Sequence, residues 1–187
     1  MTQSAVVVVA LVVSACAPPI PLNHQSPATF NLEPAGYEQA EVVKVIDGDT
    51  ITVRITARVE GVGAGATQIG ETHDVRLLGI DTPETVRPNT PIECFGRESS
   101  AAAKALLEDE NVRLVDDVEN VDRYGRLLRY VYIGDEMANA RLVVNGYASV
   151  YTYPPNVRHA NLFVQLQRDA RENERGLWSP DSCAGEP

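Results

Sequence analysis

The segment from Glu41 to Ile55 (EVVKVIDGDTITVRI) constrains the fold most strongly, because apolar and polar residues alternate on both sides of an Asp-Gly-Asp turn. Alternation with a period of two is typical of strands with one buried face, and a short turn that contains glycine favours a hairpin. We therefore predict two antiparallel strands joined by a tight turn. Residues 73–80 predict a third strand, and the glycine-rich residues 56–70 before it are interpreted as an extended hairpin tip.

Beyond the third strand, the pattern predicts a mixture of helices and strands. Residues 81–93 contain three prolines and predict an irregular surface loop. The expected later elements are a helix at 97–109, strands at 112–118 and 127–133, a helix at 136–145, a short extended segment at 150–153 and a helix at 156–174. Five short strands with an inserted helix favour an α+β fold that is mainly a barrel, of the five-stranded oligonucleotide-binding (OB) type with three helices outside it.

The N-terminal residues predict export. The apolar run from Ala5 to Ala15 is too short to span a bilayer but suits the hydrophobic region of a signal peptide. Residues 13–16 (VSAC) resemble a bacterial lipobox, in which Cys16 would be lipidated, whereas residues 15–17 also fit a cleavage site that would release a soluble protein. The prolines that follow disfavour the alternative of a buried N-terminal strand. The expected organisation is a lipoprotein-like signal peptide at 1–16, a disordered Pro-rich tether at 17–39, the folded domain at 40–180 and a C-terminal tail at 181–187.

Export makes the remaining cysteines interpretable. Once Cys16 is assigned to the lipid or to the cleaved peptide, Cys94 and Cys183 remain as a pair. An oxidising compartment favours a disulfide between them, and two free thiols are the alternative. A bridge would pin the C-terminal tail to the middle of the domain.

Acidic residues gather at two predicted turns. Asp47 and Asp49 lie in the hairpin turn, and Asp81 and Glu84 follow the third strand. The DGDT sequence is not an EF-hand loop, because the later ligand positions of that pattern are absent. Oxygen ligands from two loops could still hold a calcium ion, which takes about 6–8 oxygens, some of them from water and the backbone.

Arg76 and Arg126 are the basic residues that stand out. An arginine in a strand is usually a surface residue with its guanidinium in water, but a guanidinium is also a two-pronged partner for phosphate. The formal net charge of −10 provides no long-range attraction to nucleic acid. Clustered arginines and a bound cation can outweigh that charge at short range. Two arginines and a metal would neutralise a phosphodiester as negative charge develops on it.

Six segments between Val42 and Trp178 resemble the staphylococcal nuclease (thermonuclease) family, in the order of that family. They are VIDGDTITV, VRLLGIDTPE, ECFGRESSAAAKALL, VDRYGRLLRYVY, ANARLVVNGYASVYTYPPN and GLWSP. The resemblance implies a five-stranded OB barrel with three helices. It also implies a calcium-dependent endonuclease that hydrolyses DNA and RNA, with the 5′-oxygen leaving and 3′-phosphate products.

The resemblance implies specific roles for the acidic residues. Asp49, Asp81 and the backbone carbonyl of Thr82 would bind calcium, and Glu84 would position or deprotonate the attacking water. Asp47 would lie near the metal, behind its ligands. These residues fall in the two turns that the acidic pattern marks.

The resemblance implies that arginines and tyrosines bind the substrate. Arg76 and Arg126 would hold the scissile phosphate and stabilise its transition state. Stacking of a base on an aromatic ring tolerates any sequence and is worth about 1–3 kcal/mol. The other substrate-binding residues that the resemblance implies are Tyr124, Tyr151, Tyr153 and Arg123, the last at the position of a family lysine.

The alternative function is a non-catalytic nucleic-acid-binding OB module on an exported lipoprotein. Asp49, Asp81, Glu84, Arg76 and Arg126 are all present, which favours the enzyme. A binding module has no physical need for acids that face each other, because they repel unless a cation lies between them. We expect a monomer, secreted or held in the cell envelope, that touches a membrane only through a lipid on the N-terminal cysteine.

Overall fold

The computed structural model describes residues 35–85 and 91–183. The predicted signal peptide, the lipidation site at Cys16 and most of the predicted tether lie outside these residues. Strand β1 begins at Tyr37, before the expected domain start at residue 40, because residues 37–39 pair with residues 57–59. Within the described part of the chain, no helix is long and apolar enough to cross a membrane.

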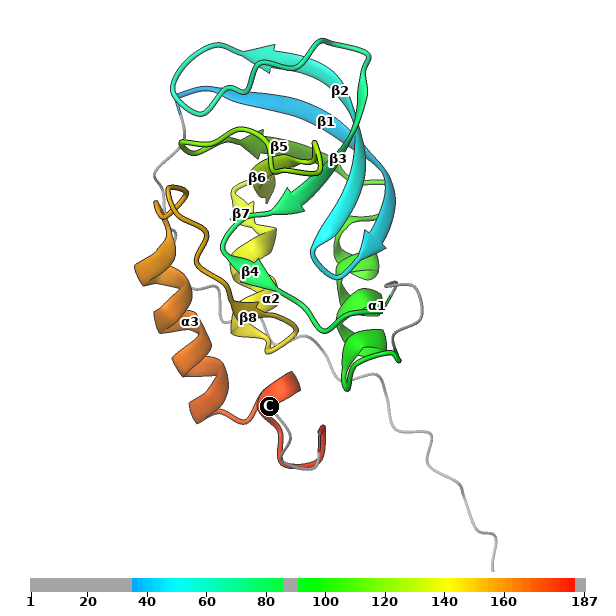
Figure 1. Cartoon of the computed structure of the whole chain (residues 1–187), viewed down its shortest axis with the longest axis vertical. Coiled ribbons are helices and arrows are strands. Elements are labelled where there is room, and N and C mark those ends of the chain that lie inside the picture. Colours follow the sequence, from blue (N-terminus) through cyan, green and yellow to red (C-terminus); the bar gives the residue numbers. More distant parts are fainter. Residues whose placement is uncertain (1–34, 86–90, 184–187) are drawn as a thin grey trace, which may run out of the picture. The chain divides into compact units, whose positions relative to one another are not determined.

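Five strands form the predicted barrel, and the barrel is closed (Figure 1). The strand order is β3-β2-β1-β5-β6, and β6 pairs in parallel with β3 to close the barrel. The barrel strands are β1 (Tyr37–Asp47), β2 (Thr50–Val59), β3 (Thr72–Leu77), β5 (Asn111–Val115) and β6 (Leu127–Ile133). Shorter strands are β4 (Ile80–Asp81), which pairs with β8 (Ser149–Val150), and β7 (Glu136–Met137), which pairs antiparallel with the end of β6.

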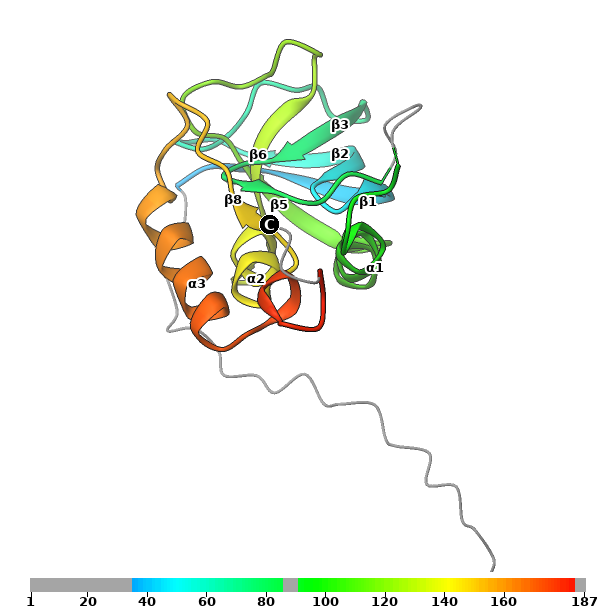
Figure 2. The same ribbon diagram turned by 60° about the horizontal axis from the view of Figure 1, so that its bottom comes forward.

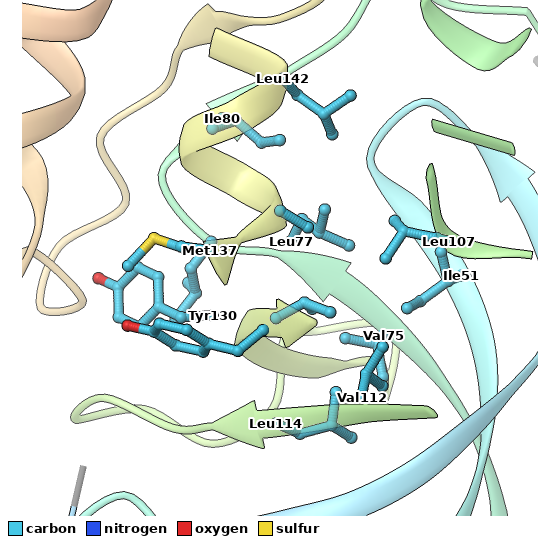
Figure 3. Packing of buried hydrophobic residues seen from close by; sticks show 14 of the residues in the cluster. Ile51, Val75, Leu77, Ile80, Leu107, Val112, Leu114, Tyr130, Met137 and Leu142 are labelled. Atoms are coloured by element: carbon cyan, nitrogen blue, oxygen red, sulfur yellow. The ribbon is translucent and has the colours of Figure 1, made fainter. Parts of the chain in front are cut away.

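Three α-helices in the described residues lie together on one side of the barrel (Figures 1 and 2). They are α1 (Gly96–Leu107), α2 (Ala138–Val144) and α3 (Ala160–Glu172), followed by a 3-10 turn at Gly176–Trp178. Figure 3 shows barrel residues such as Ile51 and Leu77 in one cluster with Leu107 of α1 and Leu142 of α2. The predicted α+β OB fold with three helices is therefore confirmed.

Several element boundaries differ from the prediction. Helix α3 begins at Ala160 and not at 156, because the Asn156 side chain accepts hydrogen bonds from the backbone N–H groups of Val118 (2.9 Å) and Glu119 (2.7 Å). Helix α2 begins at Ala138 and not at 136, because Glu136 and Met137 form β7. Local periodicity carries no information on such long-range hydrogen bonds.

A buried ion pair joins β1 to β6. Glu38 and Arg129 are both fully buried, and Arg129 Nη2 lies 2.9 Å from Glu38 Oε2. The other carboxylate oxygen accepts the backbone N–H of Thr67 at 3.0 Å, which fixes the hairpin tip between β2 and β3 to the barrel. Glu38 belongs to the segment that the sequence predicted as tether, so that boundary was wrong at this residue.

The structure contains the predicted disulfide. Cys94 and Cys183 are bridged with a Cα–Cα distance of 5.8 Å, within the ordinary range for a disulfide. The bridge links the residues just before α1 to the segment after the 3-10 turn. It closes a loop across a sequence separation of 89 residues.

Candidate active site

The turn between β1 and β2 presents Asp47 and Asp49. Asp49 Oδ2 accepts the backbone N–H of Thr82 at 2.9 Å, and Asp47 Oδ1 accepts the Thr85 hydroxyl at 2.6 Å. A Cβ atom at position 48 would lie only 2.6 Å from the Thr82 hydroxyl, so the turn requires glycine there. The two aspartates therefore join the hairpin turn to the segment that follows β4.

A bend at Gly79 brings Asp81 close to Arg76. The predicted third strand ends at Leu77, and Gly79 follows with a φ of 79°, in the left-handed region that favours glycine. The Asn139 side chain holds the bend by donating a hydrogen bond to the carbonyl of Leu78 at 2.9 Å. The chain then turns back, so that Arg76 Nη2 lies 2.6 Å from Asp81 Oδ1.

One guanidinium bridges the two aspartates predicted to bind metal. Besides its contact with Asp81, Arg76 forms an ion pair through Nη1 with Asp49. The Arg76 and Asp49 side chains are only 16% and 10% exposed, so their contact is largely shielded from solvent, whereas the Asp81 side chain is 53% exposed. Arg76, Asp49 and Asp81 come from three different strands or turns, and the bend in the chain makes them one cluster.

Burial and neighbouring charges act on the acids of this cluster. Burial raises the pKa of Asp81, and the carboxylates of Asp49 and Glu93 raise it further, while Arg76 lowers it; the balance is a raised value. Burial also raises the pKa of Asp47, although hydrogen bonds from Thr85 and the backbone oppose the shift. The neighbouring carboxylates of Asp49, Asp81 and Glu93 repel one another when ionised, and a cation between them would relieve this repulsion.

Glu84 lies beside the cluster, held by backbone hydrogen bonds. Its Oε1 accepts the N–H of Thr85 at 3.1 Å. Its own N–H donates to Glu93 Oε2 at 3.0 Å, and its carbonyl accepts the N–H of Glu93, also at 3.0 Å. Glu93 was not predicted as a site residue, because it lies nine residues beyond Glu84 and outside the acidic turn that follows the third strand.

Arg126 is oriented by Asp122. Asp122 Oδ2 accepts Arg126 Nε at 2.7 Å, and Oδ1 accepts the backbone N–H groups of Tyr124 (2.9 Å) and Arg126 (3.0 Å). Burial opposes ionisation of Asp122, but these hydrogen bonds outweigh it and lower its pKa. Asp122 was not predicted as a site residue, although the spacing of Asp and Arg in DRYGR was a usable signal.

The Tyr124 ring lies beside two arginines. The guanidinium carbons of Arg123 and Arg126 lie 4.7 and 5.4 Å from the ring centre, and Arg123 also donates a hydrogen bond to the Tyr124 hydroxyl at 2.7 Å. The Tyr124 and Tyr151 side chains are exposed, and Tyr153 is half-buried. This surface combines positive charge with aromatic faces, which suits a nucleotide.

Two adjoining cavities meet at the arginines. One, of about 450 Å³, is lined by acids that include Asp49, Asp81 and Glu84. The other, of about 360 Å³, is lined by Arg123 and by the tyrosines Tyr124, Tyr151 and Tyr153. Both are lined by Arg76, Asp81, Tyr124 and Arg126. A phosphate next to Arg76 and Arg126 would therefore face acids on one side and tyrosines on the other.

The donor set suits a hard cation. No group of three or more His, Cys, Asp or Glu side chains among the described residues is arranged to hold a metal by itself. Asp49 and Asp81 are nevertheless close enough to share one positive charge, which the Arg76 guanidinium supplies here. Two carboxylates completed by water and backbone carbonyls would suit calcium, which accepts all three kinds of oxygen.

The chain is similar in sequence to known nucleases. The family described as staphylococcal nuclease homologue matches residues 74–180. The chain is 41% identical to the thermonuclease of Staphylococcus intermedius over 137 residues, covering 73% of the chain and 74% of that relative. It is 38% identical to the thermonuclease of Staphylococcus hyicus, covering 79% and 80%, and 33% identical to the endonuclease YncB of Bacillus subtilis, covering 73% and 59%.

The thermonuclease and endonuclease relatives, together with an OB barrel that presents acids, two arginines and tyrosines at adjoining cavities, identify the chain as a nuclease that hydrolyses phosphodiester bonds. The chain belongs to the staphylococcal nuclease family. The resemblance found in the sequence is thereby confirmed.

The contact between Asp122 and Arg126 provides a test of the site. The Asp122→Asn variant keeps the size of the side chain but loses the charge that orients the guanidinium, so we expect the rate of phosphodiester hydrolysis to fall roughly 10-fold or more. Steady-state kinetics on an oligonucleotide measure the effect. An unchanged rate, with the native circular dichroism spectrum, would show that Arg126 needs no such support.

Proposed function

We propose that this protein is a calcium-dependent endonuclease that cleaves DNA and RNA and leaves 3′-phosphate ends. The observation that carries the proposal is the pair of cavities that meet at Arg76 and Arg126. The acidic cavity would bind the cation and the attacking water, and the cavity with tyrosines would bind the nucleotide. The thermonuclease and endonuclease relatives support the same reading.

Each group in the site has a proposed role. Asp49, Asp81 and the Thr82 carbonyl would hold calcium, which supplies positive charge near the phosphate when bound. Arg76 and Arg126 bind the non-bridging oxygens and stabilise the charge that develops there.

The bond changes follow from these positions. Glu84 orients a water molecule and accepts its proton, and the water oxygen forms a new bond to phosphorus. The bond between phosphorus and the 5′-oxygen breaks, the leaving oxygen takes up a proton from solvent water to become a hydroxyl, and Glu84 releases its proton to solvent. The products are a 3′-phosphate and a 5′-hydroxyl end.

Asp47 stabilises the turn between β1 and β2 by accepting hydrogen bonds from the N–H of Gly48 and the hydroxyl of Thr85.

The tyrosines would bind the nucleotide without selecting a sequence. Tyr124, Tyr151 and Tyr153 line the same cavity, beside Arg123. Aromatic faces stack on any base, so we expect cleavage of both single-stranded DNA and RNA. A monomer suffices for this function, because one chain provides all of the groups named.

We also propose that the protein is exported. The predicted signal peptide and the disulfide support this location, because disulfides persist in oxidising compartments. Lipidation of Cys16 would hold the enzyme in the cell envelope, and cleavage after Ala17 would release it. A mass measurement of the mature N-terminus distinguishes the two forms.

Analysis of the products tests the proposed reaction. Purified protein with calcium should convert end-labelled single-stranded DNA and RNA to shorter fragments with 3′-phosphate ends, which a phosphatase shifts on a denaturing gel. Chelation of calcium should stop the reaction. Intact substrate under calcium, at both moderate and high salt, would contradict the proposal.

A further inference from the structure

Glu93 holds the backbone of Glu84 at two points. Its carboxylate accepts the N–H of Glu84, and its own N–H donates to the carbonyl of Glu84, each at 3.0 Å. The two hydrogen bonds act on opposite sides of one residue, so they fix both its position and its rotation. Glu93 also lines the acidic cavity.

Glu93 is itself anchored by the residues that follow it. Its carbonyl accepts the N–H of Gly96 at 3.0 Å, at the start of α1. The next residue, Cys94, is bridged to Cys183. The segment before Cys183 is fixed in turn, because the N–H of Leu177 donates to the carbonyl of Gly146 at 2.8 Å, at the end of α2. A covalent and hydrogen-bonded path therefore connects Glu93 to two helices.

The Glu84 side chain is connected through Thr85 to Asp47, in the turn between β1 and β2. The Glu84 carboxylate accepts the N–H of Thr85 at 3.1 Å, and the Thr85 hydroxyl donates to Asp47 at 2.6 Å. Asp47 lies at the end of β1, in the rigid barrel. The barrel thus supports the residue after Glu84, and Glu93 supports Glu84 itself.

We propose that Glu93 is a positioning residue for Glu84, and that the Cys94–Cys183 disulfide keeps Glu93 in place. This inference rests on the proposed function, because it assigns Glu93 to the reaction through Glu84. The feature that matters is the hydrogen-bond acceptor of the Glu93 side chain and not its charge. Misplacement of a reacting group by about 1 Å can cost about 100-fold in rate, so a weakened support should lower kcat and leave KM nearly unchanged.

Two substitutions of Glu93 test the proposal. Glu93→Ala removes the acceptor and should lower kcat about 10- to 100-fold. Glu93→Gln keeps an acceptor oxygen without the charge and should restore most of that loss. Equal losses in both variants would show that the charge is required and would overturn the positioning role. Glu98→Ala, which removes an exposed acid on α1, is the matched control and should behave as the wild type.

Hydrogen exchange provides a readout that does not depend on activity. The Glu84 amide should exchange faster in Glu93→Ala than in the wild type and at close to the wild-type rate in Glu93→Gln. Unchanged exchange in the alanine variant would overturn the proposal, even if activity falls. An inactive wild-type protein would instead contradict the proposed function, so the two failures are distinguishable.

Removal of the disulfide tests the second part. The double variant Cys94→Ser, Cys183→Ser should stay folded at low temperature, show faster exchange at the Glu84 amide and have a lower kcat with a similar KM. Mild reduction of the wild type should reproduce these effects, and reoxidation should reverse them. A reduced enzyme that stays folded with full kcat would show that the disulfide has no part in placing Glu93.

Discussion

Replacing Arg76 by alanine is expected to lower the rate of phosphodiester hydrolysis by about 10³-fold, which is the scale of loss when one preorganised group that stabilises transition-state charge is removed. Arg76 lines both cavities and contacts both aspartates predicted to bind metal. Steady-state kinetics on a short oligonucleotide at saturating calcium measure the effect. The loss should appear in kcat more than in KM if the arginine acts mainly in the transition state.

Two further variants separate the effect of the two-pronged guanidinium geometry of Arg76 from the effect of its positive charge. Arg76→Lys keeps the positive charge but not the two-pronged geometry, so it should recover only part of the lost rate. Arg168→Ala removes an exposed arginine on α3, whose side chain is 72% exposed, and should leave the rate unchanged. If Arg76→Ala kept more than a tenth of the wild-type rate, the central role given to this guanidinium would be wrong.

Replacing Arg129 by alanine should destabilise the fold by about 3–5 kcal/mol, because it leaves the buried Glu38 carboxylate with only the longer contact to Arg58, at 3.7 Å. Both side chains are fully buried, and Arg129 also donates to the carbonyls of Asn120 (3.1 Å) and Leu128 (2.9 Å). Equilibrium unfolding in urea measures the change. A loss of less than 1 kcal/mol would show that water or another group compensates the carboxylate.

A double variant provides the control for the buried pair. Replacing both charges together, as in Glu38→Leu with Arg129→Met, should cost much less than the single change, because no buried charge is left alone. The comparison isolates the cost of the unpaired charge from the loss of packing. Equal costs for the single and the double variant would contradict this interpretation.

The buried ion pair of Glu38 and Arg129 also predicts how the stability of the fold depends on pH. Burial opposes ionisation of Glu38, but Arg129 and the hydrogen bonds from Thr67 outweigh it and lower the pKa. A lowered folded-state pKa means that the stabilisation is complete above the ordinary pKa of a glutamate and is lost as the pH falls through the lower value. Urea unfolding of the wild type at a series of acidic pH values should show this decline.

The fold was largely predictable because its strands carry a strong local signal. Alternation around the Asp-Gly-Asp turn predicted β1 and β2, and the alanine-rich segment predicted α1. The errors lie where distant residues decide the conformation. Asn156 binds a loop far away in the sequence, and Glu38 is buried only because Arg129 lies on a strand that closes the barrel. Composition alone placed Glu38 in a Pro-rich tether.

The principal acids and arginines of the candidate site were predictable from the sequence, but the contacts that position them were not. The two acidic turns and the two arginines could be marked by type and position, and the structure brings Asp49, Arg76 and Asp81 into contact. The bend at Gly79 that produces this contact was not predicted, and the strand was expected to continue to residue 80. An isolated glycine in an apolar run is compatible with a continuous strand, a bulge or a bend, so the sequence does not distinguish them. Glu93 acts on Glu84 through backbone hydrogen bonds, which no side-chain pattern reveals.

The most direct test of the central claim is the rate of oligonucleotide cleavage as a function of free calcium, compared between the wild type and the double variant Asp49→Asn, Asp81→Asn. We expect the wild-type rate to rise with calcium to a plateau. The double variant should stay inactive at every calcium concentration and keep the native circular dichroism spectrum. A wild-type rate that does not depend on calcium, or a double variant that cleaves as fast as the wild type, would contradict the account.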